Sequence, residues 1–342
     1  MCDPVGFLIY TFTLFGLYAT ALFRNFFLLS LFLFVTVLLS AFRGNAGIDT
    51  YLYVDRYTVL ESGFIGIQNI SIVEPLIPLL MWVSKTLGGS FILFSIIFGV
   101  LVSFLYFRII KTIPNSIYFS LCCFPVIFLD SLFNGLRVGL AYPLIFLAVY
   151  YSSIIYFVLG SFSHISALIA APFQIFSNKK FTIFIFVLIS SFIIFDSEIY
   201  QLIFQRFDSK FNQYQSIFTR NAYSGIADSS LLFVASLIFL RTKGFSGKTF
   251  LKAMFPLFII IALLHFFLIS KFVFMLRVTR FIDIIFFAMI AKSNQKIDSL
   301  SLNISTIFGF FYILNFLRQI SNSCYYDFNN GFLPLTNYLF NL

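Results

Sequence analysis

The feature that most constrains this chain is a succession of long apolar segments. Uninterrupted apolar runs occupy residues 5–23, 26–42, 91–110, 116–133, 136–153, 154–176, 181–196, 253–270, 277–291 and 301–318. A helix of roughly 20 apolar residues spans the hydrocarbon core of a bilayer. The strands of a membrane barrel would instead alternate apolar and polar residues, and this sequence has no such alternation. The pattern predicts an all-α integral membrane protein.

The composition supports a membrane protein with many crossings. Of the 342 residues, 60% are hydrophobic and only 10% are charged, whereas a soluble domain carries roughly 25% charged residues. With the shorter runs at 73–87 and 229–240, we expect a polytopic helical bundle of about 10–12 transmembrane helices in a single domain spanning residues 1–342. The net charge of +9 is spread over short loops, which is typical of membrane topology rather than of nucleic-acid binding.

The distribution of Lys and Arg orients the predicted bundle. Short loops rich in these residues stay in the cytoplasm. The candidates are residues 241–252, residues 291–299, Arg108/Lys111 and Lys179/Lys180. Two long polar connections, 43–72 and 197–229, are then periplasmic. In the second, aromatic residues recur at steps of four and three, which predicts an amphipathic helix in the bilayer interface, either a surface anchor or a lid over a lipid-linked substrate.

Strict alternation of sides fails at residues 73–87 and 154–176. Alternation is restored if one or both segments re-enter the membrane from the same side or cross it twice. Re-entrant backbone is tolerated at membrane depth only where it lines a cavity within the protein. These two segments are therefore where we expect a site, with a simple failure of the charge bias as the alternative.

Ionisable residues inside apolar spans are costly and indicate function. Asp130, Asn134 and Arg137 are spaced to share one helix face, with an Asp–Arg pair that only ties down the helix end as the alternative. Glu74 precedes Pro75, so it is either a site residue or a helix cap at the membrane boundary.

His164 and two arginines extend this set. His164 lies between Ser163 and Ser166, whose hydroxyls can hydrogen-bond its ring, and interhelical packing is the alternative. Arg277 and Arg280 are three residues apart within an apolar run. Asp283 follows at the next turn and is a candidate partner for Arg280.

Several chemistries lack their sequence motifs. The chain has no phosphate-binding Gly-rich loop, no dinucleotide fingerprint, no zinc-type Cys/His spacing, no Asp-x-Asp and no Gly-x-Ser-x-Gly. We therefore expect neither a metal nor a cofactor. What remains is arginine, which grips phosphate oxygens through two parallel donors. Arg43, Arg137 and the Arg277/Arg280 pair fall on one predicted face, which favours an anionic ligand such as a diphosphate.

An ordered set of motifs carries a family resemblance. These are FRGNAGIDTYLYVDRY with Arg43, Asp49 and Tyr53, EPLIPLL with Glu74, FNGLRVGLA with Asn134 and Arg137, SHISALIAAP with His164 and Ser166, and LRVTRF with Arg277 and Arg280. In this order they resemble the EpsG-like branch of bacterial polysaccharide polymerases of the Wzy type. Ile48 stands where many relatives would have Thr before Asp49, so a hydroxyl is missing from that loop.

The resemblance implies a glycosyltransferase of GT-C-like architecture in the bacterial inner membrane, with its site facing the periplasm. It would join oligosaccharide units carried on undecaprenyl diphosphate into O-antigen or a related polysaccharide. Its implied partners are that lipid-linked substrate and the bilayer, with a chain-length regulator as a candidate. The alternatives are a flippase for the same lipid-linked oligosaccharide and an O-antigen ligase-like glycosyltransferase.

The residues fit this reaction in the following roles. Asp49, Glu74 and His164 are alternative general bases for the attacking hydroxyl. Arg43, Arg137, Arg277 and Arg280 would bind the diphosphate, with Tyr53, Asn134 and Ser166 as further substrate-binding residues. Tyr51, Tyr53 and Tyr57 are candidates for stacking on sugar rings at the membrane surface.

Overall fold

The computed structural model describes residues 4–42, 50–68, 70, 74–112, 128, 131–132, 135–171, 275–292 and 314. Every element within these residues is helical. The chain divides into two compact units, which are described separately. The first contains residues 1–144, 159–164 and 297–342, and the second contains residues 145–158 and 165–296. The predicted loop 197–229 and the apolar runs 181–196, 229–240 and 253–270 lie outside the described residues, so these predictions stay predictions.

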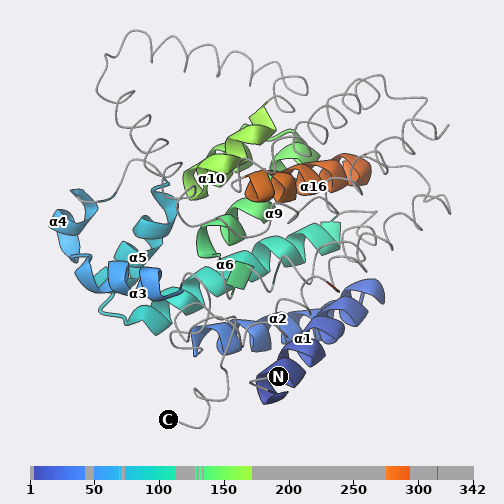
Figure 1. Ribbon diagram of the computed structural model, residues 1–342, viewed down its shortest axis with the longest axis horizontal. Coiled ribbons are helices and arrows are strands. Elements are labelled where there is room, and N and C mark those ends of the chain that lie inside the picture. The colour runs from blue at the N-terminus through green and yellow to red at the C-terminus, as the bar shows by residue number, and fades with distance from the viewer. Residues whose placement is uncertain are drawn as a thin grey trace. The chain divides into compact units, whose positions relative to one another are not determined.

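Three apolar helices form the framework of the first unit. They are α1 (Pro4–Leu22), α2 (Phe26–Ala41) and α6 (Phe91–Thr112), and α2 packs against both of the others (Figure 1). Gly99 of α6 lies against Val37 of α2, so closely that a Cβ on Gly99 would be 2.9 Å from Val37 Cγ1. At the other end of the contact, the rings of Phe26 and Phe107 lie 6.1 Å apart. Helices α2 and α6 are therefore antiparallel, with a small residue allowing close approach.

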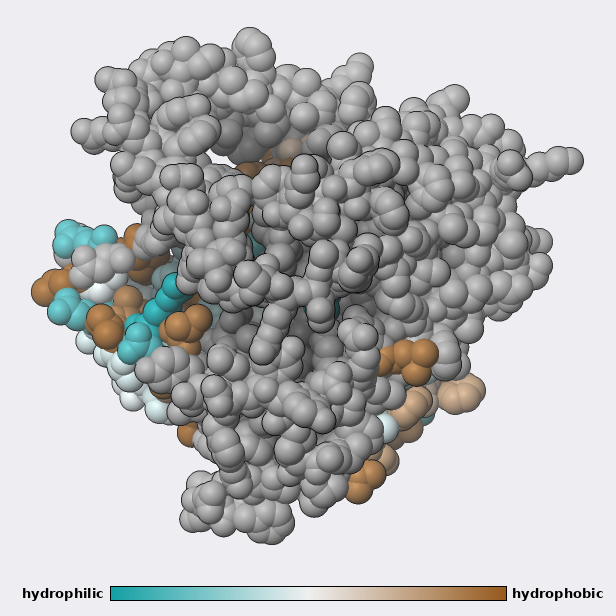
Figure 2. Space-filling view, viewed as in Figure 1, coloured by the Kyte–Doolittle hydropathy of each residue, from teal (hydrophilic) through white to brown (hydrophobic). Residues whose placement is uncertain are grey.

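The first long connection is more ordered than its polar sequence suggests. It contains α3 (Thr50–Val59) and α4 (Gly63–Gln68), where the sequence predicted a loop. The reason is amphipathicity: Tyr53 and Tyr57, one turn apart, are buried, whereas Asp55 and Arg56 are exposed. Figure 2 shows the resulting mixture of hydrophilic and hydrophobic surface over these helices.

Tyr57 fixes α3 to the start of α6. Its ring lies 5.7 Å from that of Phe91, and its hydroxyl donates a hydrogen bond to the carbonyl of Gly89 at 2.7 Å. Rings buried in this way cannot stack on a sugar, so that predicted role is wrong for Tyr57 and also for Tyr53, which is 3% exposed. The Tyr51 side chain is not among those described.

Two of the predicted apolar segments form short helices. Helix α5 (Leu76–Thr86) has 11 residues, and α10 (Ile154–Ser163) has 10 residues. At about 1.5 Å per residue, neither is long enough to cross a bilayer. The 154–176 run breaks at His164, after which the 3₁₀ helix η1 (Ile165–Ala170) begins. These are the two segments at which alternation failed in the sequence.

The remaining helices are α9 (Leu136–Tyr151) and, in the second unit, α16 (Met275–Lys292), which packs against η1. Of the helices that the structure describes, α6 is the one long and apolar enough, by length and composition, to cross a membrane, and α2, α5, α9 and α10 are shorter apolar helices. The predicted 10–12 crossings and their orientation stay predictions.

Candidate functional site

Four side chains that the sequence singled out meet in the first unit. Tyr53 comes from α3, Glu74 precedes α5, Arg137 is the second residue of α9, and His164 directly follows α10. Glu74 and His164 thus stand at the ends of the two short helices. Helix ends are tolerated at membrane depth where they are buried within the protein. The same two segments were expected to hold a site.

The centre of the cluster is an ion pair between Arg137 and Glu74. Arg137 Nη1 lies 2.6 Å from Glu74 Oε2, and the Arg137 Nε–H group donates to Tyr53 Oη at 3.2 Å. The Glu74 side chain is 4% exposed and that of Arg137 is 19% exposed. Two bonds to fixed partners hold the guanidinium plane in one orientation, and bonds between ionised groups are the strong ones.

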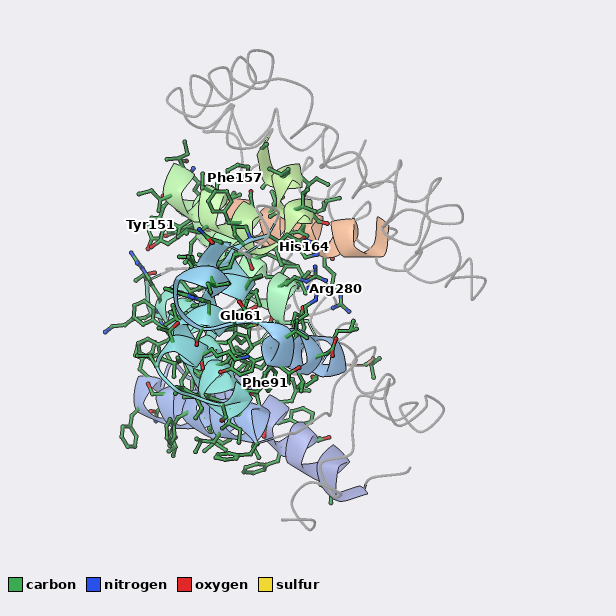
Figure 3. The ribbon with its side chains drawn as sticks, turned by 90° about the vertical axis from the view of Figure 1, so that its left-hand side faces the viewer. Glu61, Phe91, Tyr151, Phe157, His164 and Arg280 are labelled. Carbon is green, nitrogen blue, oxygen red and sulfur yellow. The ribbon has the colours of Figure 1, made fainter. Side chains whose placement is uncertain are left out.

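His164 lies beside the same carboxylate. Its Nε2 atom is 4.0 Å from Glu74 Oε1, the oxygen that Arg137 does not use, and its side chain is 5% exposed. This separation is longer than a hydrogen bond, but catalytic hydrogen bonds commonly tighten only when substrate is bound. His164 is labelled in Figure 3.

Ser163 anchors the two helix ends to each other. Its hydroxyl donates to the backbone carbonyl of Arg137 at 2.7 Å. The sequence had suggested that this hydroxyl bonds the His164 ring, and the structure gives it a different acceptor. The bond ties the end of α10 to the start of α9, which sets the positions of His164 and Arg137 together.

The backbone at Glu74 is strained. Its φ angle is +58°, a left-handed conformation that costs a non-glycine residue about 1–3 kcal/mol. The helix-cap alternative is not supported, because the residue at the N-cap of α5 is Pro75 and the Glu74 carboxylate binds Arg137. Strain of this kind persists when surrounding contacts fix it, and here the ion pair does so.

Two contacts that sequence reasoning missed support the cluster. Lys85 Nζ donates to the carbonyls of Tyr57 and Thr58 at 2.8 and 3.0 Å, which caps the C-terminal end of α3. A Cβ on Gly139 would lie 2.6–2.7 Å from Ser131 atoms, including its backbone. Gly139 therefore lets α9 pass close to residue 131. Neither residue has a sequence signal beyond its type.

The described structure does not test whether the other predicted site residues join this cluster. Arg43, Asp49, Asn134 and the proposed Arg137 partner Asp130 lie outside the described residues. Ser166 lies in η1 and Arg280 on α16, both in the second unit, and the Arg277 side chain is not described. Grouping of the three arginine sites therefore stays a prediction.

The arrangement offers a fixed cation and a carboxylate–histidine pair. The guanidinium can hold an anion, and the imidazole can accept a proton while the carboxylate balances the charge that forms. Within the part of the chain that the structure describes, no three His, Cys, Asp or Glu residues are grouped as metal ligands.

Comparison with known proteins adds one match. The model of the EpsG family matches residues 25–337, a range that includes all four residues of the cluster. No curated protein and no solved structure matches the chain significantly.

Proposed function

Because the chain belongs to the EpsG family, we propose that it is a polysaccharide polymerase of the bacterial inner membrane that uses undecaprenyl-diphosphate-linked oligosaccharides. A hydroxyl of the incoming unit attacks the anomeric carbon of the growing chain. The bond from that carbon to the lipid diphosphate breaks as the new glycosidic bond forms. The hydroxyl proton goes to a base, and the lipid diphosphate leaves as an anion.

The observation that carries the proposal is the orientation of Arg137. Glu74 and Tyr53 engage its Nη1 and Nε atoms, and within the described residues its Nη2 atom makes no hydrogen bond. Arg137 is also the more exposed member of the ion pair. A guanidinium held in this way presents its remaining N–H groups to phosphate oxygens without losing further freedom on binding. It would stabilise the charge that develops on the leaving diphosphate.

We assign the base role to His164 and an orienting role to Glu74. The Glu74 carboxylate is shared between Arg137 at 2.6 Å and the His164 ring at 4.0 Å. A carboxylate beside an imidazole holds the ring in place and balances the charge formed when the ring takes a proton. Asp49 remains an alternative base on sequence grounds.

One feature of the first unit supports a site that faces the periplasm. Arg24, Arg108 and Lys111 lie at the end of the α2–α6 pair opposite to α3, and α1, α2 and α6 contain no Asp or Glu. Basic residues favour the cytoplasm, so the opposite end favours the periplasm.

Deletion of the gene tests this function. The expected surface polysaccharide on a gel is the lipid core capped with a single repeat unit, without the ladder of longer chains. Complementation with the intact gene should restore the ladder. Loss of even the single capped unit would contradict a polymerase and indicate a flippase or a ligase.

A further inference from the structure

The end of the first unit opposite to the cluster carries a second group of cations. Arg24, in the turn between α1 and α2, has its Cζ atom 5.8 Å from the centroid of the Phe26 ring. Lys111, in the last turn of α6, has Nζ 5.8 Å from the Phe107 ring. The two rings meet edge to face at 6.1 Å. We call these four residues, Arg24, Phe26, Phe107 and Lys111, the cation–aromatic clasp.

The backbone conformation of Arg24 is one that glycine would adopt more easily. Its φ angle is +54°, a left-handed conformation that Gly adopts freely and that strains an arginine. The next residue, Asn25, caps α2 by accepting a bond from Leu28 N at 3.1 Å and needs no arginine before it. Glycine would make the same turn with less strain, so the turn alone does not explain Arg24.

The charge and exposure of the clasp suit a lipid surface. Both cations are exposed, and the neighbouring Phe23 and Phe27 are each 79% exposed. No acidic residue occurs on α1, α2 or α6 to neutralise the cations. Cations stacked on aromatic rings keep N–H groups for an anion. Exposed aromatic side chains beside basic ones are typical of the membrane–water interface.

We infer that the cation–aromatic clasp binds the phosphate headgroup of an anionic phospholipid, and that it does so at the cytoplasmic leaflet. That leaflet carries the negative surface charge that attracts basic residues beside a transmembrane helix. Phe23 and Phe27 would lie among the acyl chains, while Arg24 of the α1–α2 turn and Lys111 of α6 would bind the headgroup phosphate. The bound lipid would join the α1–α2 turn to the end of α6.

The test measures lipid binding by the full-length protein. Native mass spectrometry follows titration with phosphatidylglycerol or phosphatidylcholine for the unchanged protein, the Arg24→Gly/Lys111→Gln variant and the control Arg56→Gln. Arg56 is exposed on α3, so the control removes one charge elsewhere. We expect the double variant to lose roughly 25-fold in phosphatidylglycerol affinity, because each cation near an anionic surface contributes about fivefold. Arg56→Gln and the phosphatidylcholine titrations should show no such change.

Further arms distinguish a lipid site from a structural contact or a general anion site. Arg24→Gly alone should keep or raise the unfolding temperature while weakening phosphatidylglycerol binding, because glycine relieves the strain. If that variant does not fold, Arg24→Asn serves instead, since Asn tolerates the left-handed conformation. Unchanged lipid affinity in the double variant, an equal loss in Arg56→Gln, or displacement of phosphatidylglycerol by inorganic phosphate would overturn the inference.

Discussion

Arg137 and Arg24 place the same side chain in two opposite settings at the two ends of the first unit. Arg137 is largely buried, paired with Glu74 and fixed by Tyr53. Arg24 is exposed and lies over the ring of Phe26. Among the described residues it makes no ion pair with an acidic side chain. A buried charge requires partners, and these hold its side chain in one orientation. A cation already held in orientation can stabilise a transition state without reorganising during the reaction. An exposed charge keeps its freedom, which suits attraction to a surface.

The surfaces around the two arginines differ in the same way. Over α3 and α4, near the cluster, hydrophilic and hydrophobic side chains alternate, whereas the surface along α1 is mainly hydrophobic (Figure 2). Glu61 and Phe91, labelled in Figure 3, belong to the end of the unit where α3 meets α6. We therefore expect the end with α3 and α4 to carry out the reaction, and the end with the cation–aromatic clasp to bind the lipid surface. The following changes test that division, beginning with the largest expected effect.

Removing the ion pair should abolish polymerisation. We expect Arg137→Ala to reduce the rate by at least ~10²-fold, the usual cost of losing one charge-stabilising donor. Glu74→Ala leaves a buried cation without its partner and should also destabilise the protein by about 3–5 kcal/mol. The gel ladder and the membrane abundance of each variant are the measurements, with Arg56→Ala as control.

The paired change separates catalysis from packing. Glu74→Leu/Arg137→Leu removes both charges and should recover abundance, because no unpaired charge stays buried. It should not recover the ladder. A restored ladder in this double variant would mean that the ion pair only holds the helices together.

Replacing His164 should lower the polymerisation rate nearly as much as Arg137→Ala does. His164→Asn keeps a polar side chain of similar reach but cannot act as a base, so we expect a rate loss of ~10²–10⁴-fold at normal abundance. In a reconstituted assay, the rate of the unchanged protein should fall at low pH. The residual rate of the His164→Asn variant should not show this fall. An unchanged pH profile with full activity would exclude His164 as the base.

A change at Gly139 should act through packing alone. Gly139→Ala places a methyl group 2.7 Å from the Cα and carbonyl oxygen of Ser131. These backbone atoms cannot move as a side chain can, so we expect a cost of about 1–3 kcal/mol. At Gly135 the added methyl meets, among the described residues, only the end of the Val138 side chain, so Gly135→Ala is a milder control. Thermal unfolding in detergent measures both, and equal melting temperatures would contradict the close approach.

The smallest effect is expected at Lys85. Lys85→Met keeps the aliphatic stem but loses two hydrogen bonds to the end of α3, each contributing about 0.5–1.5 kcal/mol. The ladder should shorten rather than vanish, because Tyr57 still holds α3 through Gly89 and Ser84. Lys111→Met, at the opposite end, should leave the ladder unchanged. Equal shortening of the ladder by Lys85→Met and Lys111→Met would contradict the division between the two ends.

The sequence predicted the members of the cluster better than their pairing. Glu74, Arg137 and His164 stood out because ionisable groups are costly in apolar spans. Glu74 and Arg137 are 63 residues apart, so no local spacing linked them, and the helical spacing instead suggested Asp130 as the partner. Which distant charges meet depends on how the helices pack, and a single sequence does not contain that information.

The fold shows the same limit. Apolar run length located α1, α2, α6, α9 and α16 to within a few residues. The polar connection after α2 was predicted as a loop, because its charges hid the one-turn spacing of Tyr53 and Tyr57. The Tyr57 side chain is buried against the start of α6. Tertiary contact converts this weakly amphipathic stretch into a helix.

The central claim is that Arg137 grips the lipid diphosphate through its planar, oriented donors. The most direct measurement is the affinity of purified, full-length protein in nanodiscs for undecaprenyl diphosphate, compared between Arg137 and Arg137→Lys. Lysine keeps the charge but lacks the two-pronged geometry, so we predict a loss of roughly tenfold or more in affinity. Equal affinity, together with a complete polysaccharide ladder from the lysine variant, would contradict the claim.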